Sequence, residues 1–412
     1  MGLILYNLSV WFYWLFLRLA APFHKKAKLM LEGRKKLWPE LEAKLQGNTA
    51  AVVWFHCASL GEFEQGRPII EAFAKQYPDH KIALSFFSPS GYEVRKNYAG
   101  AHYIFYLPKD SAKNARKLVA LLQPKLAVFV KYEFWHYFTR ELKNQNVPVI
   151  SISAIFRDSQ LFFKPYGSFY RNILRNFSWF FTQNQHSEDL LKSIGINQVS
   201  VAGDTRFDRV LQTAAGIKQI PEVEAFKAGK EIFMIGSSWP EDMQVLVPFI
   251  KKHQQELKFI IAPHEIHENE IAAICNDFSG TAVRFSEAGN KDLKAYSVLI
   301  IDNIGMLSSL YGYGSYAYIG GAFGKGLHNT LEAAVFGLPL FFGPNYQKFQ
   351  EAKDLVSLQT AFPVNNLNEL ETVFGNAKKP GQKITIAERQ KKYINQQAGA
   401  TAKIMDWITT TL

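Results

Sequence analysis

Short apolar runs alternate with amphipathic stretches along most of this chain, and the order predicts strands separated by helices. The run AAVVWFHCAS (50–59) ends in small residues, and helix-like segments such as 66–78 and 111–124 lie between later runs. Runs that are apolar on both faces and separated by helices are typical of parallel sheets covered on both sides. In the first half we expect strands at 50–59, 81–88, 102–108, 126–130, 148–154, 179–184 and 199–203.

The same alternation restarts after a polar, irregular stretch at 208–229, which gives a second set of expected strands at 231–238, 258–264, 281–286, 297–303, 316–323 and 338–344. A chain of 412 residues is too long for one ordinary α/β core. We therefore expect a Rossmann-like domain at 46–207, a linker at 208–229 and a second Rossmann-like domain at 230–412. Two doubly wound domains should face each other across a cleft and bind ligands at the C-terminal ends of their strands.

The first 45 residues follow neither pattern. Residues 3–22 are apolar and rich in aromatic side chains, and a basic cluster runs from Lys25 to Lys36. The apolar run barely reaches the about 20 residues that cross a bilayer, and Arg18 inside it can snorkel. We predict a membrane-anchoring helix with its basic cluster on anionic lipid and the rest of the chain in the cytoplasm. The alternative is a core helix packed on the first domain. Positive charge follows the apolar run, which argues against a cleaved signal.

Charge and cysteine content narrow the functional class. The formal net charge is +11, and an excess of basic side chains attracts nucleic acid or phospholipid. The aromatic residues are not interleaved with basic ones as a nucleic-acid surface requires, so phospholipid is favoured. The two cysteines, Cys57 and Cys275, are far apart, which argues against a disulfide framework or a zinc site.

Three charged residues stand at predicted strand ends or junctions. Glu62 falls where the helix after the first strand should begin, so it either caps that helix or acts as a general base, and position alone favours the cap. Glu133, amid aromatic residues, is either buried and paired or catalytic. Arg206 either forms an interdomain salt bridge with Asp204 or Asp208, or stabilises charge in the cleft.

Glycine-rich turns predict anion binding in the second half. After Gly321, backbone N–H groups at a helix start near Thr330 would suit a phosphate, and Lys325 would add charge. His328 and Asn329 could donate hydrogen bonds there, and Glu332 could accept them from ribose hydroxyls; a turn needed only for packing is the alternative.

A similar turn, Gly236-Ser237-Ser238 before Pro240, predicts a second anion cradle. His264 also ends a strand and serves either the ligand or a surface loop. The chain has no GxxxxGK[ST] loop and no GxGxxG after the first strand, which argues against a P-loop NTPase and an ordinary dehydrogenase. No DxD-type motif stands at a strand end, which favours metal-independent chemistry.

Taken together, the motifs resemble a known family. ASLGEFEQGRP, SFFSPSGYE, KYEFW, SAIFR, GDTRFD, GSSW and the GGAF…HNTLEAA block are similar in order and spacing to the Kdo (3-deoxy-D-manno-octulosonic acid) transferases, over about residues 1–400. The resemblance implies a GT-B fold and an inverting glycosyltransferase that moves Kdo from CMP-Kdo to a lipid A precursor, lipid IVA. It implies lipopolysaccharide biosynthesis at the cytoplasmic face of the inner membrane, with no metal or other cofactor.

The resemblance also implies residue roles. Glu62 would be the base that deprotonates the acceptor hydroxyl, which reverses the preference for a cap, and Glu133 and Arg206 would steady the transition state. The donor site expected from the resemblance and the glycine-rich turns comprises Gly236, Ser237, Ser238, Pro263, His264, Gly305, Met306, Leu307, Gly321, Lys325, His328, Asn329, Thr330, Leu331 and Glu332. Many family members have Pro-Arg-His where this chain has Pro-His-Glu at 263–265, Gly-Glu where it has Gly-Met at 305–306, and Lys where it has Arg206.

Two other functions remain as alternatives. One is a GT-B transferase or epimerase that uses a UDP-sugar, which donor competition would separate from a CMP-Kdo enzyme. The other is a membrane scaffold that keeps the fold without catalysis, against which the presence of Glu62, Glu133 and Arg206 argues.

Overall fold

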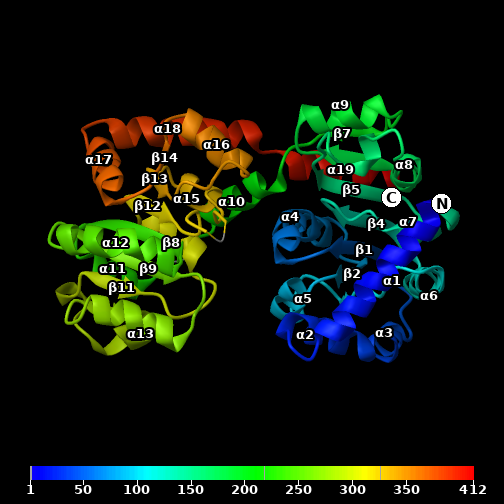
Figure 1. The fold of residues 1–412 in the computed structure, drawn as a ribbon, viewed down its shortest axis with the longest axis horizontal. Helices are drawn as coiled ribbons and strands as arrows, with labels where there is room; N and C mark the ends of the chain where they lie inside the picture. Colours follow the sequence, from blue (N-terminus) through cyan, green and yellow to red (C-terminus); the bar gives the residue numbers. More distant parts are fainter. Residues whose placement is uncertain (1, 218, 325) are drawn as a thin grey trace. The chain divides into compact units, whose positions relative to one another are not determined.

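The computed structural model describes residues 2–217, 219–324 and 326–412. Contacts divide the chain into two compact units: unit 1 holds the residues up to Arg209 together with Gln397–Leu412, and unit 2 holds Val210–Gln396. Each unit is built on a seven-stranded parallel sheet with helices packed on it (Figure 1). The strand–helix alternation therefore predicted the fold class correctly.

The sheet of unit 1 has the order β3-β2-β1-β4-β5-β6-β7. Its strands are β1 (Val52–Cys57), β2 (Lys81–Phe86), β3 (Tyr103–Tyr106), β4 (Pro124–Val130), β5 (Val149–Ala154), β6 (Trp179–Thr182) and β7 (Val199–Val201). Its helices are α1 (Gly2–Ala20), α2 (Lys25–Lys35), α3 (Leu37–Leu45), α4 (Leu60–Gln76), α5 (Pro89–Arg95), α6 (Ala112–Leu122), α7 (His136–Asn144), α8 (Ser168–Leu174), α9 (Gln185–Ser193) and α19 (Ala400–Thr411). The strand order reverses between β1 and β4, and doubly wound sheets bind their ligands at such a switch point.

Strand β1 shows why these apolar runs form central strands. All six of its residues are buried. Val52 and Trp54 join the hydrophobic cluster on one face of the sheet, whereas Val53, Phe55 and Cys57 join the cluster on the other face. Successive side chains of a strand point to opposite faces, so a strand covered on both sides must be apolar throughout.

The last helix, α19, corrects the predicted domain boundary at the C-terminus. We expected residues 230–412 to form one domain, but α19 packs in unit 1, where Ala400, Ile404 and Ile408 are buried in the same cluster as the apolar face of α4. Asp208 fixes its start: the N–H groups of Gly399 and Thr401 each donate to this carboxylate over 2.6 Å. Periodicity reveals that such a helix has an apolar face but not which sheet the face covers.

The N-terminal helix α1 lies across unit 1 and exposes most of its apolar surface (Figure 1). By length and composition it could cross a membrane, and only 6% of its most apolar 18-residue stretch is buried. Tyr6 is the buried residue of α1, and its hydroxyl donates to Asp110. A core helix would be buried on its apolar side, so this prediction of an exposed apolar helix agrees with the structure.

The sheet of unit 2 has the order β10-β11-β9-β8-β12-β13-β14. Its strands are β8 (Glu231–Ser238), β9 (Leu257–Pro263), β10 (Ala282–Arg284), β11 (Val298–Ile300), β12 (Tyr316–Ile319), β13 (Leu340–Phe342) and β14 (Ala361–Pro363). Its helices are α11 (Pro221–Lys227), α12 (Pro240–His253), α13 (Glu268–Asp277), α14 (Leu307–Leu310), α15 (Leu331–Ala334), α16 (Gln350–Ser357), α17 (Leu367–Ala377) and α18 (Gln382–Gln397). Phe233, Phe259, Phe341 and Phe374 bring β8, β9, β13 and α17 into one core cluster.

Two segments differ from the sequence-based expectation. The polar stretch 208–229 is largely helical, because α10 (Thr205–Ala215) and α11 occupy most of it. Strand β14 was not predicted: it has three residues, ends at Pro363 and pairs only with β13 among the described strands. An edge strand this short leaves too few residues for a periodic pattern.

Candidate functional site

A chain of hydrogen bonds leads from the core of unit 1 to Glu133. Trp54 Nε1–H donates to Ser85 Oγ over 2.8 Å, and Ser85 Oγ lies 2.8 Å from Nδ1 of His56. On the other side of the ring, His56 Nε2 lies 2.9 Å from Glu133 Oε2, which also accepts from Trp135 Nε1 over 2.7 Å. An ionised carboxylate only accepts, so His56 Nε2 carries the proton. Glu133 is thus held at the end of β4 through one oxygen.

Glu62 occupies the first turn of α4, directly after β1. Ser59, the N-cap residue, makes no capping bond with its side chain, and its hydroxyl instead donates to Oε2 of Glu62. The carboxylate therefore does not close the helix cap, although the positive end of the helix favours its charge. Glu62 is half-buried and keeps Oε1 for another partner, since Ser59 is its hydrogen-bond partner in the described part of the chain.

Both carboxylates lie near the Cys57 thiol. Burial, and after it the charges of Glu62, Glu133 and Glu64, raise the pKa of the Cys57 thiol well above its usual range. Coulomb interactions weaken with distance, so both predicted carboxylates lie close to the end of β1. Cys57 itself stays a protonated thiol and is no nucleophile at neutral pH. We call Glu62, Glu133 and His56 the carboxylate site.

Arg206, the third predicted catalytic residue, is engaged in a salt bridge. Its Nε and Nη2 lie 2.9 and 2.7 Å from Oδ2 of Asp204, and its backbone N–H donates to Oδ1. Burial alone would raise the pKa of Asp204, but the charge and hydrogen bonds of Arg206 hold it below its usual range. Asp204 is thus the partner, but the expectation of an interdomain salt bridge was wrong, because both residues lie in unit 1. The role of Arg206 in the transition state stays a prediction.

Two residues near the carboxylate site were not assigned from the sequence. His56 lies inside a buried strand, and from the sequence a histidine in that position is interpreted as a core residue. Arg157 follows β5, and its guanidinium lies 6.0 Å from the Tyr132 ring. Burial raises the pKa of Tyr132, Arg157 lowers it and Glu62 raises it, so this ring lies near both charges. Its position just after the end of β5 is the sequence signal by which Arg157 could have been identified as a candidate site residue.

Three aromatic rings form a cluster at the carboxyl ends of β8, β9 and β12 in unit 2. The Trp239 and His264 rings stack with centroids 4.5 Å apart, and the His264 and His328 centroids are 4.3 Å apart. Trp239 Nε1–H donates to His328 Nε2 over 3.1 Å, so the proton of neutral His328 sits on Nδ1. We call Trp239, His264 and His328 the ring cluster.

Both histidines of the ring cluster are neutral near pH 7. Burial, and next the neighbouring His264, lower the pKa of His328 from its usual 6.5 to about 4. Burial likewise lowers the pKa of His264. Neutral His264 can offer one N–H and one lone pair, whereas His328 can offer only its Nδ1–H, because Trp239 occupies its lone pair. Such groups suit a nucleobase or a hydroxyl as well as a phosphate.

The lowered pKa of His328 predicts a pH dependence of stability. The unfolded chain protonates this ring near pH 6.5, whereas the folded chain resists until about pH 4. The free energy of unfolding of unit 2 should therefore fall as pH drops from 6.5 toward 4, and this loss should level off below. Urea unfolding at pH 7 and pH 5 measures the slope. His328→Gln should flatten it; an unchanged slope in the variant would contradict the assignment.

Asp242 links the ring cluster to the glycine-rich turn at Gly321. This fully buried carboxylate accepts from the N–H groups of Trp239 and Gly321 and from the Tyr318 hydroxyl, each over 2.9 Å. Burial raises the pKa of Asp242, although these three hydrogen bonds oppose the shift. Asp242 was not predicted, although its place three residues after the N-cap Trp239 is that of the acidic residue in a capping box, whose carboxylate accepts from the N-cap N–H.

The predicted glycines at this edge allow close packing of the protein against itself. At Gly236 a Cβ would overlap the Tyr311 hydroxyl, and at Gly321, where φ is +93°, it would overlap the carbonyl of Gly326. Beside them, the buried hydroxyls of Ser238 and Thr330 have no hydrogen-bond partner in the described parts of the chain. Buried polar atoms are normally paired, so both hydroxyls are candidates to bind a ligand.

The remaining predicted donor residues lie in two adjoining loops. Ser308, just after the 305–307 segment, donates to Glu332 over 2.7 Å, and Asn329 donates to the other oxygen of Glu332 over 3.1 Å. Both oxygens of Glu332 are thus engaged within the protein. Asn329 Oδ1 accepts from the N–H of Leu331.

Some predictions at these loops need correction or stay open. The helix expected to start near Thr330 is the four-residue α15, so its dipole is that of one turn only. Lys325 lies outside the described residues. Pro263 ends β9, Met306 is the N-cap of α14, and Ser237 has a positive φ of 53° after Gly236. Within the described ranges, no group of three or more His, Cys, Asp or Glu side chains could hold a metal ion.

Comparisons with known proteins agree with the resemblance. The family described as 3-deoxy-D-manno-octulosonic-acid transferase (kdotransferase) matches residues 30–209. A 3-deoxy-D-manno-octulosonic acid transferase of Aquifex aeolicus is 27% identical, over 88% of this chain and 96% of its own length. The same enzyme of Chlamydophila psittaci is 24% identical, over 85% of this chain and 82% of its length.

Solved structures show the fold. A UDP-GlcNAc 2-epimerase from Neisseria meningitidis has a TM-score of 0.58 at 15% identity, over 87% of this chain and all of that one. This similarity indicates a common GT-B-like architecture of two parallel α/β domains. The family match over residues 30–209 and the relatives over most of the chain go further than fold: the chain is similar to 3-deoxy-D-manno-octulosonic acid transferases, which are glycosyltransferases.

Proposed function

We propose that this protein transfers Kdo from CMP-Kdo to a hydroxyl of a lipid A precursor, with Glu62 as the general base. The observation that carries the proposal is the carboxylate site at the switch point of unit 1, where Glu62 keeps an oxygen for a proton and Glu133 is fixed after the neighbouring strand. The similarity to 3-deoxy-D-manno-octulosonic acid transferases supports Kdo as the sugar. The resemblance noted from the sequence supports CMP-Kdo and lipid IVA as the two substrates.

The proposed step needs one base and a stabilised leaving group. Glu62 takes the proton of the acceptor hydroxyl, the hydroxyl oxygen bonds to the anomeric carbon of Kdo, and the bond from that carbon to the phosphate oxygen breaks. CMP leaves as a phosphate monoester, and the anomeric centre inverts because attack and departure occur on opposite faces. Arg157, near Glu62, could offset negative charge there.

Unit 2 would hold the nucleotide. The unpaired hydroxyls of Ser238 and Thr330 suit a phosphate or a ribose. The neutral rings of the ring cluster offer stacking surface to a cytosine base. Since we propose that no metal takes part, transfer should be unchanged when EDTA is added.

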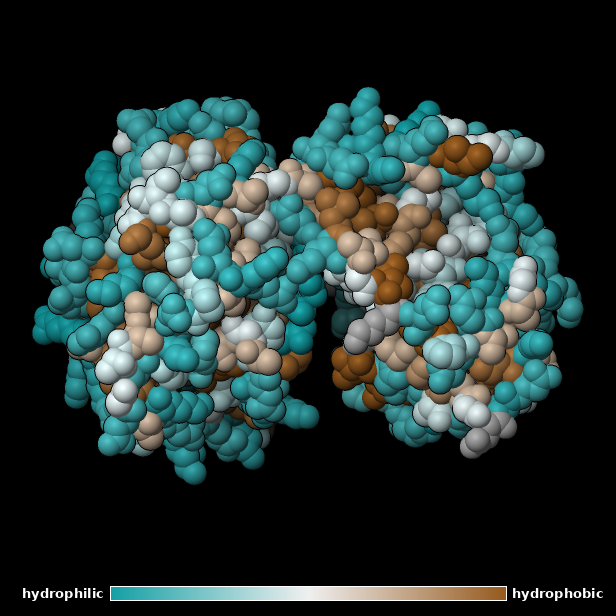
Figure 2. Space-filling model, turned by 180° about the vertical axis from the view of Figure 1, so that it is seen from behind, coloured by the Kyte–Doolittle hydropathy of each residue, from teal (hydrophilic) through white to brown (hydrophobic). Residues whose placement is uncertain are grey.

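We further propose that α1 lies in the plane of the membrane surface rather than across it. Contacts with unit 1 run along the helix: Tyr6 donates to Asp110, Tyr13 contacts Met30, and Trp14 lies 5.1 Å from the Arg34 guanidinium. A helix crossing the bilayer could not pack along the domain at these positions. Its outward side carries the exposed apolar residues Ile4, Leu5, Leu8, Trp11, Phe12, Phe16 and Leu19. Figure 2 shows unit 1, the left-hand body, from behind, and the surface of unit 1 on that face is mostly hydrophilic.

The hydrogen-bond chain predicts that His56 positions Glu133. Removing the ring in His56→Ala leaves a largely buried carboxylate oxygen without one donor, which costs about 1–3 kcal/mol. If the same cost raises the free energy of the transition state, kcat falls by about 10- to 100-fold. His56→Gln, whose amide can still donate, should recover part of kcat at unchanged KM. Equal loss in both variants, with equal thermal stability, would contradict a positioning role.

Mass spectrometry of lipid IVA after incubation with CMP-Kdo and the full chain tests the function. A gain of Kdo-sized mass supports the proposal, and the number of additions counts the sugars transferred. A gain with a UDP-sugar but none with CMP-Kdo would favour the UDP-sugar alternative. Binding of CMP without turnover of either donor would favour a scaffold.

A further inference from the structure

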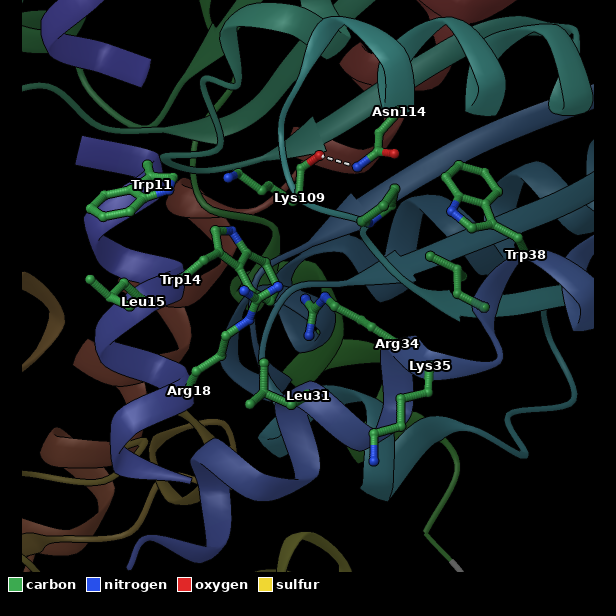
Figure 3. Close-up of a pocket in the computed structure, with 12 residues that line it drawn as sticks. Trp11, Trp14, Leu15, Arg18, Leu31, Arg34, Lys35, Trp38, Lys109 and Asn114 are labelled. Carbon is green, nitrogen blue, oxygen red and sulfur yellow. Dashed lines mark hydrogen bonds between the residues drawn. The ribbon is translucent and has the colours of Figure 1, made fainter. Parts of the chain in front are cut away.

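A pocket of about 410 Å³ lies between α1, α2, the start of α3 and the loop that follows β3 in unit 1 (Figure 3). It is separate from the ring cluster, which belongs to unit 2. Arg18 of α1 and Arg34 of α2 reach into the space between these two helices (Figure 3). The lining residues are Trp11, Trp14, Leu15, Arg18, Leu31, Arg34, Lys35, Leu37, Trp38, Pro108, Lys109 and Asn114.

The pocket collects positive charge that the protein does not neutralise. Arg18, Arg34, Lys35 and Lys109 line it, and no Asp or Glu is among the lining residues. None of these four cations takes part in an ion pair with another described residue. Four like charges around one cavity repel one another, and an anion inside it would remove that cost.

Arg34 is the fixed cation of the pocket. Its three nitrogens donate to the backbone carbonyls of Leu107, Met30 and Phe87 over 2.7–2.8 Å, and the Trp14 ring lies 5.1 Å from it. Burial lowers the pKa of Arg34 to about 10, so it is still charged at neutral pH. A partly buried guanidinium bonded only to carbonyls keeps its full positive charge.

The apolar part of the lining points to an amphiphile rather than a free ion. Three tryptophans and three leucines share the pocket with the cations. Trp11 is half exposed and continues into the exposed apolar side of α1, next to Phe12. Tryptophan and basic side chains together are typical of the boundary between lipid headgroups and acyl chains.

We propose that this pocket binds the phosphate headgroup of one anionic phospholipid, drawn from the membrane surface on which α1 lies. The four cations surround the phosphate, and the tryptophans contact the glycerol and the first methylenes of the acyl chains. The site would give the protein a defined lipid preference in addition to the diffuse attraction of a basic surface. Binding at this pocket does not depend on the sugar transfer proposed above, and its test uses no sugar donor.

Titration of the full chain with dihexanoyl-phosphatidylglycerol, below its micelle concentration, tests the proposal by calorimetry. We expect saturable binding of one lipid per chain, much weaker binding of dihexanoyl-phosphatidylcholine, and no comparable binding of inorganic phosphate. Arg18→Gln and Lys109→Gln each remove a charged partner, so each should lower the affinity by at least about tenfold. Lys36→Gln is the matched control, because Lys36 is exposed, adjoins Lys35 and does not line the pocket.

Three results would overturn the assignment. Equal loss of affinity in the Lys36 and Lys109 variants would mean diffuse surface charge rather than a pocket. Inorganic phosphate that binds as tightly as the lipid would mean a free-anion site. Lipid IVA that displaces the phosphatidylglycerol at a much lower concentration would assign the pocket to the acceptor. Thermal melting of each variant, expected within the range of the unaltered chain, shows that folding is not the cause.

Discussion

Replacing Glu62 by Gln should lower the rate of Kdo transfer by about 10²–10⁴-fold, the usual contribution of a general base. The amide keeps the size of the side chain and can still bond to the Ser59 hydroxyl, but it cannot take a proton from the acceptor. The expected donor contacts lie in unit 2, so CMP binding should be unchanged. Single-turnover rates by mass spectrometry and CMP affinity by calorimetry measure the two effects separately.

Glu64→Gln is the control for this variant. Glu64 lies two residues further along α4 and is ion-paired with Arg95 over 2.7 Å, so its replacement should change the transfer rate little. Transfer at the unaltered rate in Glu62→Gln would remove Glu62 as the base and would leave the sugar transfer itself standing.

Replacing Asp242 by Ala should have the largest effect on stability. The change leaves the N–H groups of Trp239 and Gly321 and the Tyr318 hydroxyl without their acceptor in a buried site. Each buried donor left unpaired costs about 1–3 kcal/mol, so we expect the free energy of unfolding to fall by about 3 kcal/mol or more. That is a large share of the about 5–15 kcal/mol that keeps a domain folded. Urea unfolding measures the loss.

Asp242→Asn separates the loss of charge from the loss of acceptors. Its amide oxygen can serve some of the three donors, so its stability should lie between those of Asp242→Ala and the unaltered chain. CMP affinity should fall in the same order, because Asp242 holds the glycine turn against the ring cluster. Unfolding of Asp242→Ala at the same urea concentration as the unaltered chain would show that these bonds are not essential.

The fold class could be predicted because buried strands and amphipathic helices leave strong local patterns. Strand β1 is apolar at nearly every position, and a sheet covered on both faces requires this. The placement of α19 could not be predicted, because its apolar residues Ala400, Ile404 and Ile408 would suit either core. Long-range packing choices of this kind are not contained in a local period.

The candidate site could be predicted in part. Glu62 and Glu133 follow β1 and β4, the neighbouring strands where the sheet order reverses, so strand-end reasoning located both. His56 could not be found this way, because its role comes from the carboxylate that β4 brings next to it. Asp242 was missed for a similar reason: its partners at Tyr318 and Gly321 are distant in sequence.

The return of α19 to unit 1 also affects how the protein is made. A ribosome completes the first 209 residues well before it adds residues 397–412, so the core around α4 lacks Ala400, Ile404 and Ile408 during most of translation. Domains generally fold in order as they emerge, but here the first to emerge must wait for the last segment. Meanwhile the apolar helix α1 has already left the ribosome. If α1 binds a membrane as proposed, the nascent chain meets that membrane before its first domain has finished folding.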